Sequence, residues 1–137
     1  MRKLVLVFLT ILFVMACEKT WWAASDRVFW VQNNSNMGVS TLLGYEYPDT
    51  SIPDITGRVY RLKSALPLSK ATHDFKISTW KELFEQLPND TLSIFIFHAD
   101  TVQKYNWQEI RAGYKVLKRI EISRDDLERL QYTIEYP

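Results

Sequence analysis

The stretch "TLSIFIFH" (residues 91–98) decides the fold of this chain. It is an almost unbroken apolar run with the length of a β-strand, and such a run is typical of a strand buried on both faces. The breaker "PND" (88–90) stands before it, and the helix-start residue Asp100 follows it. We therefore predict a central strand over 91–98 and expect the other elements to pack around it.

Residue pairs typical of helix starts occur at four places in the second half of the chain. In a capping box, the N-cap side chain accepts a backbone N–H and the side chain three positions later reaches back. The matching pairs are Thr79 with Glu82, Asp100 with Gln103, Asn106 with Glu109, and Ser123 with Asp126. They predict helices over 80–87, 101–105, 107–113 and 124–130, the third of them stopped by Gly113.

Segments rich in β-branched and aromatic residues predict the remaining strands. They cover 27–34, 39–47, 57–63, 75–79, 114–122 and 132–136. The dense apolar run at 28–31 suggests burial on both faces, and Gly44 is a candidate bulge. Lys118 interrupts the apolar face of 114–122, which indicates a strand with one wet face or an edge strand.

The order of elements indicates an α+β fold. The turn at 35–38 makes an antiparallel hairpin the default for the first two strands, and the helix-containing connections of the second half permit parallel pairing. We expect a single domain over 27–137. Its single mixed β-sheet combines an N-terminal antiparallel hairpin with C-terminal βαβ-type crossovers, and the helices lie mainly on one face.

The first residues are typical of an export signal. Arg2 and Lys3 precede an uncharged, mostly apolar run over 4–15. As a helix, that run would span about 18 Å, well short of the ~30 Å hydrocarbon core of a bilayer. It fits the apolar region of a secretory signal peptide better than a membrane-spanning helix.

The end of this run resembles a bacterial lipobox, on the residues Val14-Met15-Ala16-Cys17. The resemblance implies that residues 1–16 are removed, that Cys17 is the lipid attachment site, and that 17–26 form a lipidated tether. Stable anchoring takes at least two acyl chains, which lipidation of the thiol and the new amino group supplies. An ordinary signal peptide and a buried N-terminal strand with a core cysteine remain the alternatives.

The composition of the chain excludes several classes of chemistry and of partner. Loss of residues 1–16 would leave 121 residues, with 15 basic against 16 acidic side chains. No basic stripe points to nucleic acid. Cys17 is the only cysteine, so its lipidation would exclude disulfides and a cysteine nucleophile in the mature chain.

Few residues are candidates for catalysis or metal binding. His98 and Asp100 follow one another at the end of the central strand, where a carboxylate could orient an imidazole base; they are weak candidates, because Asp100 already serves as a helix cap. Two histidines make a zinc site improbable. Asp49 and Asp54 lie on a proline-rich loop and suit turn chemistry better than Ca²⁺ binding. We therefore expect no cofactor and no metal.

Four segments carry a resemblance to a known group: "YPDTSIP" (47–53), "DTLSIFIFHADTV" (90–102), "YNWQEIRAGYKVLKRIEIS" (105–123) and "LQYTIEYP" (130–137). With them, most of residues 45–137 resembles small uncharacterised lipoproteins of Bacteroides-type bacteria, a group without an assigned activity. The resemblance implies a cell-envelope address and adds no catalytic residue.

The expected function is that of a membrane-anchored cell-envelope lipoprotein, most simply a non-enzymatic binding or accessory domain. Its partners would be membrane lipid, through acylated Cys17, and an envelope protein or glycan. The stretch Glu18-Lys19-Thr20 matches acidic surface-export signals poorly, which favours the periplasmic face of the outer membrane. A small envelope hydrolase with a site near the end of the 91–98 strand is the alternative, and a purely structural role is also open.

Overall fold

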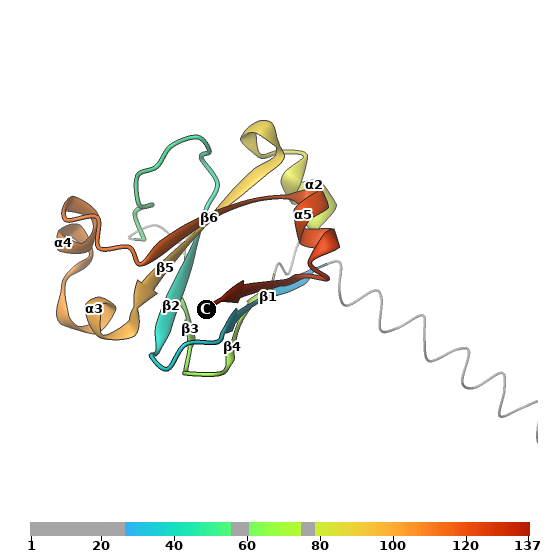
Figure 1. Cartoon of the computed structure of the whole chain (residues 1–137). Helices are drawn as coiled ribbons and strands as arrows, with labels where there is room; N and C mark the ends of the chain where they lie inside the picture. Colours follow the sequence, from blue (N-terminus) through green and yellow to red (C-terminus); the bar gives the residue numbers. More distant parts are fainter. Residues whose placement is uncertain (1–26, 56–60, 75–78) are drawn as a thin grey trace, which may run out of the picture.

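The computed structural model describes residues 27–55, 61–74 and 79–137 (Figure 1). Within them the chain forms an α+β fold. The strands are β1 (Val28–Asn33), β2 (Val39–Gly44), β3 (Lys63–Ala65), β4 (Lys70–Asp74), β5 (Thr91–His98), β6 (Lys118–Ser123) and β7 (Thr133–Tyr136). The helices are α2 (Trp80–Phe84), α3 (Ala99–Lys104), α4 (Trp107–Ala112) and α5 (Arg124–Arg129), with a 3₁₀ turn η1 (Pro88–Asp90).

The strands form two sheets, so the expectation of a single mixed sheet is wrong. One sheet has the order β4-β1-β7 and the other the order β3-β2-β5-β6. The predicted hairpin of the first two strands does not form, because β1 pairs with β4 and β7 whereas β2 pairs with β3 and β5. The loop between β1 and β2 therefore carries the chain from one sheet to the other.

The parallel crossovers expected in the second half are also absent. β6 pairs with β5 in the antiparallel sense, with Ile94 opposite Ile120. β7 leaves that sheet and runs parallel to β1, with Val31 opposite Ile134. A helix-containing connection permits parallel pairing but does not require it, and here the connections return the chain antiparallel or move it to the other sheet.

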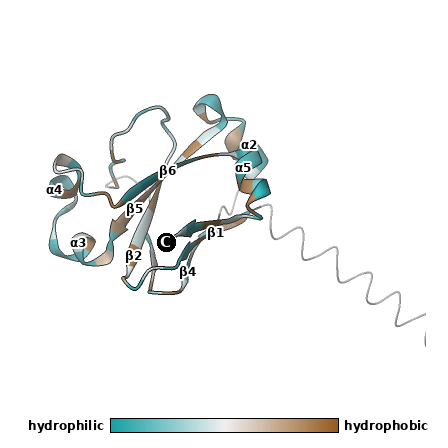
Figure 2. Ribbon diagram, viewed as in Figure 1, coloured by the Kyte–Doolittle hydropathy of each residue, from teal (hydrophilic) through white to brown (hydrophobic). Residues whose placement is uncertain are grey.

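The prediction of a central strand over 91–98 is confirmed. Six consecutive residues of β5 are buried, and alternate side chains enter two different cores. Leu92, Ile94 and Ile96 face the core between the sheets, whereas Phe95 and Phe97 face a second core beneath α4 and the 45–55 loop. Figure 2 shows the contrast between brown residues on β5 and teal residues on its neighbour β6.

The sheet of β1, β4 and β7 has one face that is partly exposed to solvent. In β1 the side chains of Phe29, Val31 and Asn33 are buried, whereas Val28 and Trp30 are only half-buried. The predicted burial of 28–31 on both faces is therefore wrong, and the strand alternates with period two. Lys70 lies over the Trp30 ring, 5.6 Å from its centroid, so the long apolar stem of a lysine shields part of this outer face.

Side-chain hydrogen bonds tie the two sheets together on one side, which we call the closed seam. Asn33 is fully buried at the end of β1, and its Nδ2 donates to the carbonyl oxygens of Met37 at 2.7 Å and Leu66 at 3.0 Å. Thr41 of β2 and His73 of β4 meet at 2.8 Å between Oγ1 and Nε2. Buried polar groups need such partners, so the closed seam is internally satisfied.

The capping boxes at Thr79, Asn106 and Ser123 are confirmed, although the helices that they open are shorter than predicted. Asp100 is not the N-cap of its helix, because α3 begins at Ala99, two residues earlier than predicted, and His98 caps it. β6 begins only at Lys118 and forms a sheet edge, as the interruption by that lysine indicated.

Two predicted strands lie largely outside the residues that the structure describes. Of the strand predicted over 57–63, residues 57–60 lie outside the described residues and only Lys63 belongs to β3. Of 75–79, residues 75–78 lie outside them as well. The structure adds β4, which sequence patterning did not single out although its Ala71 and His73 alternate with exposed residues.

Candidate binding cleft

The residues singled out at the end of the central strand form a helix cap. The backbone N–H of Asp100 donates to Nδ1 of His98 at 3.1 Å, and the Asp100 carboxylate lies 3.8 Å from the same nitrogen. In the part of the chain that the structure describes, no group of three or more His, Cys, Asp or Glu residues could hold a metal ion. One imidazole nitrogen of His98, Nδ1, is thus occupied by a backbone donor.

The other histidine is a core residue. His73 is 3% exposed, stacks on Phe29 with ring centroids 4.9 Å apart, and shares the hydrogen bond with Thr41. Burial lowers the pKa of His73 to about 4, and the positive charge of Lys63 adds to the shift. The imidazole is therefore neutral at physiological pH and serves the closed seam.

An opening lies between β6 and β7, the edge strands of the two sheets that lie away from the closed seam. It is a cleft of about 630 Å³, which we call the β6–β7 cleft. Its lining residues come from both strands and the turn before β7: Lys118, Arg119, Ile120, Leu130, Gln131, Thr133, Ile134 and Glu135. That volume lies within the ~300–1,000 Å³ range of ligand sites.

Both walls of the cleft are sheet edges. β6 is the last strand of one sheet and β7 the last strand of the other, and within the described residues no strand pairs with their outer sides. Figure 1 shows β6 leading into α5 and β7 returning from it, so the two edges run in opposite directions. An edge strand exposes a row of unpaired backbone N–H and C=O groups.

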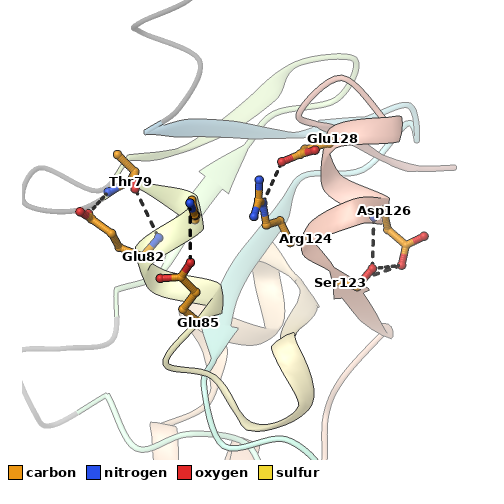
Figure 3. A network of polar contacts seen from close by, with 8 residues as sticks. Thr79, Glu82, Glu85, Ser123, Arg124, Asp126 and Glu128 are labelled. Carbon is orange, nitrogen blue, oxygen red and sulfur yellow. Dashed lines mark hydrogen bonds and ion pairs between the residues drawn. The ribbon is translucent and has the colours of Figure 1, made fainter.

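Helix α5 connects the end of β6 to the start of β7 and so lies at one end of the cleft (Figure 1). Its start is fixed by Ser123, whose Oγ donates to Oδ2 of Asp126 at 2.6 Å and accepts from the Asp126 backbone N–H at 3.1 Å (Figure 3). Hydrogen bonds from Ser123 and Arg129 lower the pKa of Asp126 to about 2. The cap therefore stays ionised and ordered at neutral pH.

The connection after α5 contains two residues with left-handed backbone conformations. Gln131 and Tyr132 both have positive φ, at 49° and 58°. This left-handed region costs a residue with a side chain about 1 kcal/mol or more, so two in succession require compensation from their surroundings. Tyr132 packs against the core between the sheets, and this burial offers that compensation.

The walls of the cleft combine apolar and charged groups. Ile134 is buried and Ile120 is partly buried against the core between the sheets, while Leu130 is 41% exposed. Lys118 and Glu135 are exposed at the end of the cleft remote from α5. Neither forms an ion pair in the described residues.

The Arg119 side chain interacts with residues of its own sheet. Its Nη2 donates to Ser93 Oγ at 3.2 Å and lies 2.9 Å from a Glu121 carboxylate oxygen, and its guanidinium lies over the Phe95 ring. The unpaired positive charge of the cleft therefore belongs to Lys118. Sequence reasoning missed the cleft, and Lys118 on an otherwise apolar strand face was the one signal that pointed to it.

The predicted lipid attachment site, Cys17, lies outside the described residues, as do the signal segment 1–16 and the tether 17–26. No helix of the described part has the length and apolar character needed to cross a bilayer. Comparison with protein-family models, curated proteins and solved structures finds no match. The proposed function therefore rests on the sequence signals and on the geometry of the cleft.

Proposed function

We propose that this chain is a lipid-anchored accessory domain of the bacterial cell envelope that binds a macromolecular partner in the β6–β7 cleft. In this proposal residues 1–16 are removed, acylated Cys17 holds the chain to the periplasmic face of the outer membrane, and the domain after the tether presents the cleft. The lipobox-like residues support the anchor, and the cleft between two unpaired sheet edges carries the binding role.

The orientation of the cleft suits an anchored domain. The first described residue, Arg27, precedes β1, whose start lies at the same end as the start of β7, since Trp30 pairs with Thr133. The exposed Lys118 and Glu135 stand at the other end of the cleft. The chain therefore enters the described domain at the end opposite Lys118 and Glu135.

The anchor is tested by the Cys17→Ser variant, expressed from the full-length gene. We expect loss of incorporated radiolabelled fatty acid and release of the chain from the membrane fraction, because only the thiol forms the thioether. The matched control Ser25→Ala, in the predicted tether, should label like the wild type. Fatty-acid incorporation into the Cys17→Ser chain would contradict the anchor.

The binding role is tested in intact cells with a photo-crosslinking residue in place of Leu130, which lines the cleft. The matched control carries the same residue in place of Thr72, which is exposed on β4, away from the cleft. We expect a discrete crosslinked product from position 130 only, and its loss when Cys17→Ser is combined with it. Equal products from both positions, or none, would contradict a partner site in the cleft.

A further inference from the structure

We propose that the β6–β7 cleft receives an extended segment of a partner protein as an additional β-strand, which joins the two sheets into one continuous sheet. This inference rests on the proposed binding role and names the class of partner. The two sheets already meet along the closed seam, so a strand between β6 and β7 would close the remaining opening into a barrel-like ring.

The backbone of the two edges selects a strand over other ligands. Each edge offers a row of N–H and C=O groups, and an extended peptide has matching rows on both of its sides. Because β6 and β7 run in opposite directions, the inserted strand is antiparallel to one and parallel to the other. A helix satisfies its own backbone groups and would leave both edges unpaired.

A strand paired with both edges needs about 9–10 Å between them, which is two neighbouring strand spacings. Within the described residues β6 and β7 do not pair with each other, and both line the cleft of about 630 Å³. The capped start of α5 orders the connection between them before the partner arrives, and such preorganisation lowers the entropic cost of binding.

The side chains of the walls define the sequence that the strand carries. Ile120 and Ile134 face the core between the sheets, so alternate residues of the inserted strand that point inward are apolar. Lys118 lies two positions before Ile120 on the same side of β6 and has no ion-pair partner in the described residues. An acidic residue at that end of the partner segment complements its charge.

The first test measures binding of synthetic peptides to the full chain in detergent. The probe alternates valine and threonine and carries a glutamate at one end; a matched probe has the same side chains with N-methylated amides. We expect saturable binding of the first probe, with slowed amide hydrogen exchange in β6 and β7, and no binding of the N-methylated one. Equal binding of both probes, or no binding of either, overturns strand insertion.

The second test exchanges charges. Lys118→Glu should weaken binding of the glutamate probe and strengthen binding of the corresponding lysine probe, each by up to about fivefold, the effect of one exposed ion pair. The control Lys104→Glu, on α3, should leave both affinities unchanged. If Lys118→Glu also leaves both unchanged, the acidic partner residue is refuted.

Two further outcomes separate this inference from the proposed function. Crosslinking from position 130 together with failure of every unmethylated peptide would keep the binding role and overturn strand insertion. Sedimentation of the full chain as a dimer, with β6 and β7 amides already protected without peptide, would make a second copy the occupant and overturn a partner strand. A monomer whose β6 and β7 amides become protected only with peptide supports the proposal.

Discussion

The closed seam and the β6–β7 cleft both lie between the two sheets of this molecule, and they differ in how their polar groups are satisfied. At the closed seam, Asn33 and the Thr41–His73 pair bond across the junction and are buried. At the cleft, two strand edges face each other without pairing. One side of the molecule therefore has its buried polar groups satisfied internally, whereas the other leaves backbone hydrogen-bonding groups without a strand partner in the described residues.

This difference has an energetic consequence. Removing a partner from a buried hydrogen bond costs the desolvation of the group left behind, whereas groups at an open edge are already hydrated. Substitutions at the closed seam should therefore lower the free energy of unfolding more than substitutions at the cleft.

The largest effect is expected for Asn33→Asp. The change replaces an amide donor with a carboxylate that faces the carbonyl oxygens of Met37 and Leu66 in a buried site. We expect a loss of about 4 kcal/mol in the free energy of unfolding, measured by urea denaturation. The matched change Asn34→Asp, at the exposed neighbouring position, should stay within about 0.5 kcal/mol of the wild type. Similar losses in both variants would mean that the buried hydrogen bonds of the closed seam contribute no more to the free energy of unfolding than an exposed position does.

The second effect is a pH dependence from His73. Its pKa is about 4 in the folded chain, against about 6.5 when unfolded, so the unfolded chain binds the extra proton between these values. Stability therefore falls as pH is lowered, and we expect a loss of about 2 kcal/mol between pH 7.5 and pH 5. His73→Gln should flatten this part of the urea-denaturation profile, and His98→Gln should retain it. A flat wild-type profile would contradict a buried neutral His73.

The third effect lies at α5, the element that connects the two walls of the cleft. Ser123→Ala removes the N-cap of α5 and should lower the free energy of unfolding by about 1 kcal/mol, measured by thermal denaturation followed by circular dichroism. Ser123→Thr keeps a capping hydroxyl and should lie close to the wild type. If the alanine variant matches the wild type, the cap does not hold this end of the cleft.

The smallest effect is a gain at the rim of the cleft. Gln131 has a φ of 49°, a conformation that glycine adopts without steric cost. We expect Gln131→Gly to raise the free energy of unfolding by about 0.5 kcal/mol, and Gln131→Ala to give no gain. A destabilised glycine variant would indicate that the Gln131 side chain contributes packing that outweighs the strain.

Local features of the fold were predictable from the sequence. The capping pairs at Thr79, Asn106 and Ser123 identified helix starts because their hydrogen bonds join residues three positions apart. The apolar run of β5 identified the central strand because both its faces are buried. Lys118 indicated that its strand has one wet face or forms an edge, since a fully buried strand would bury that charge at high cost, and β6 is an edge strand.

The candidate site was less predictable, because its parts are brought together by pairing between distant segments. His98 and Asp100 were found from their adjacency in sequence, yet they form a helix cap. The cleft depends on β7 pairing with β1, about a hundred residues earlier, instead of with its predecessor β6. No local pattern distinguishes these partners, since either pairing buries the same apolar face of β7.

By itself, the sequence determined the α+β class, the starts of three helices and the central strand, because propensity, capping and burial act over a few neighbouring residues. Only the tertiary structure decided that the strands divide into two sheets, that Asn33 and His73 join them on one side, and that β6 and β7 stay apart on the other. Strand pairing is a choice among backbone edges that are chemically alike, and that choice is made by how the whole set of side chains fills the two cores.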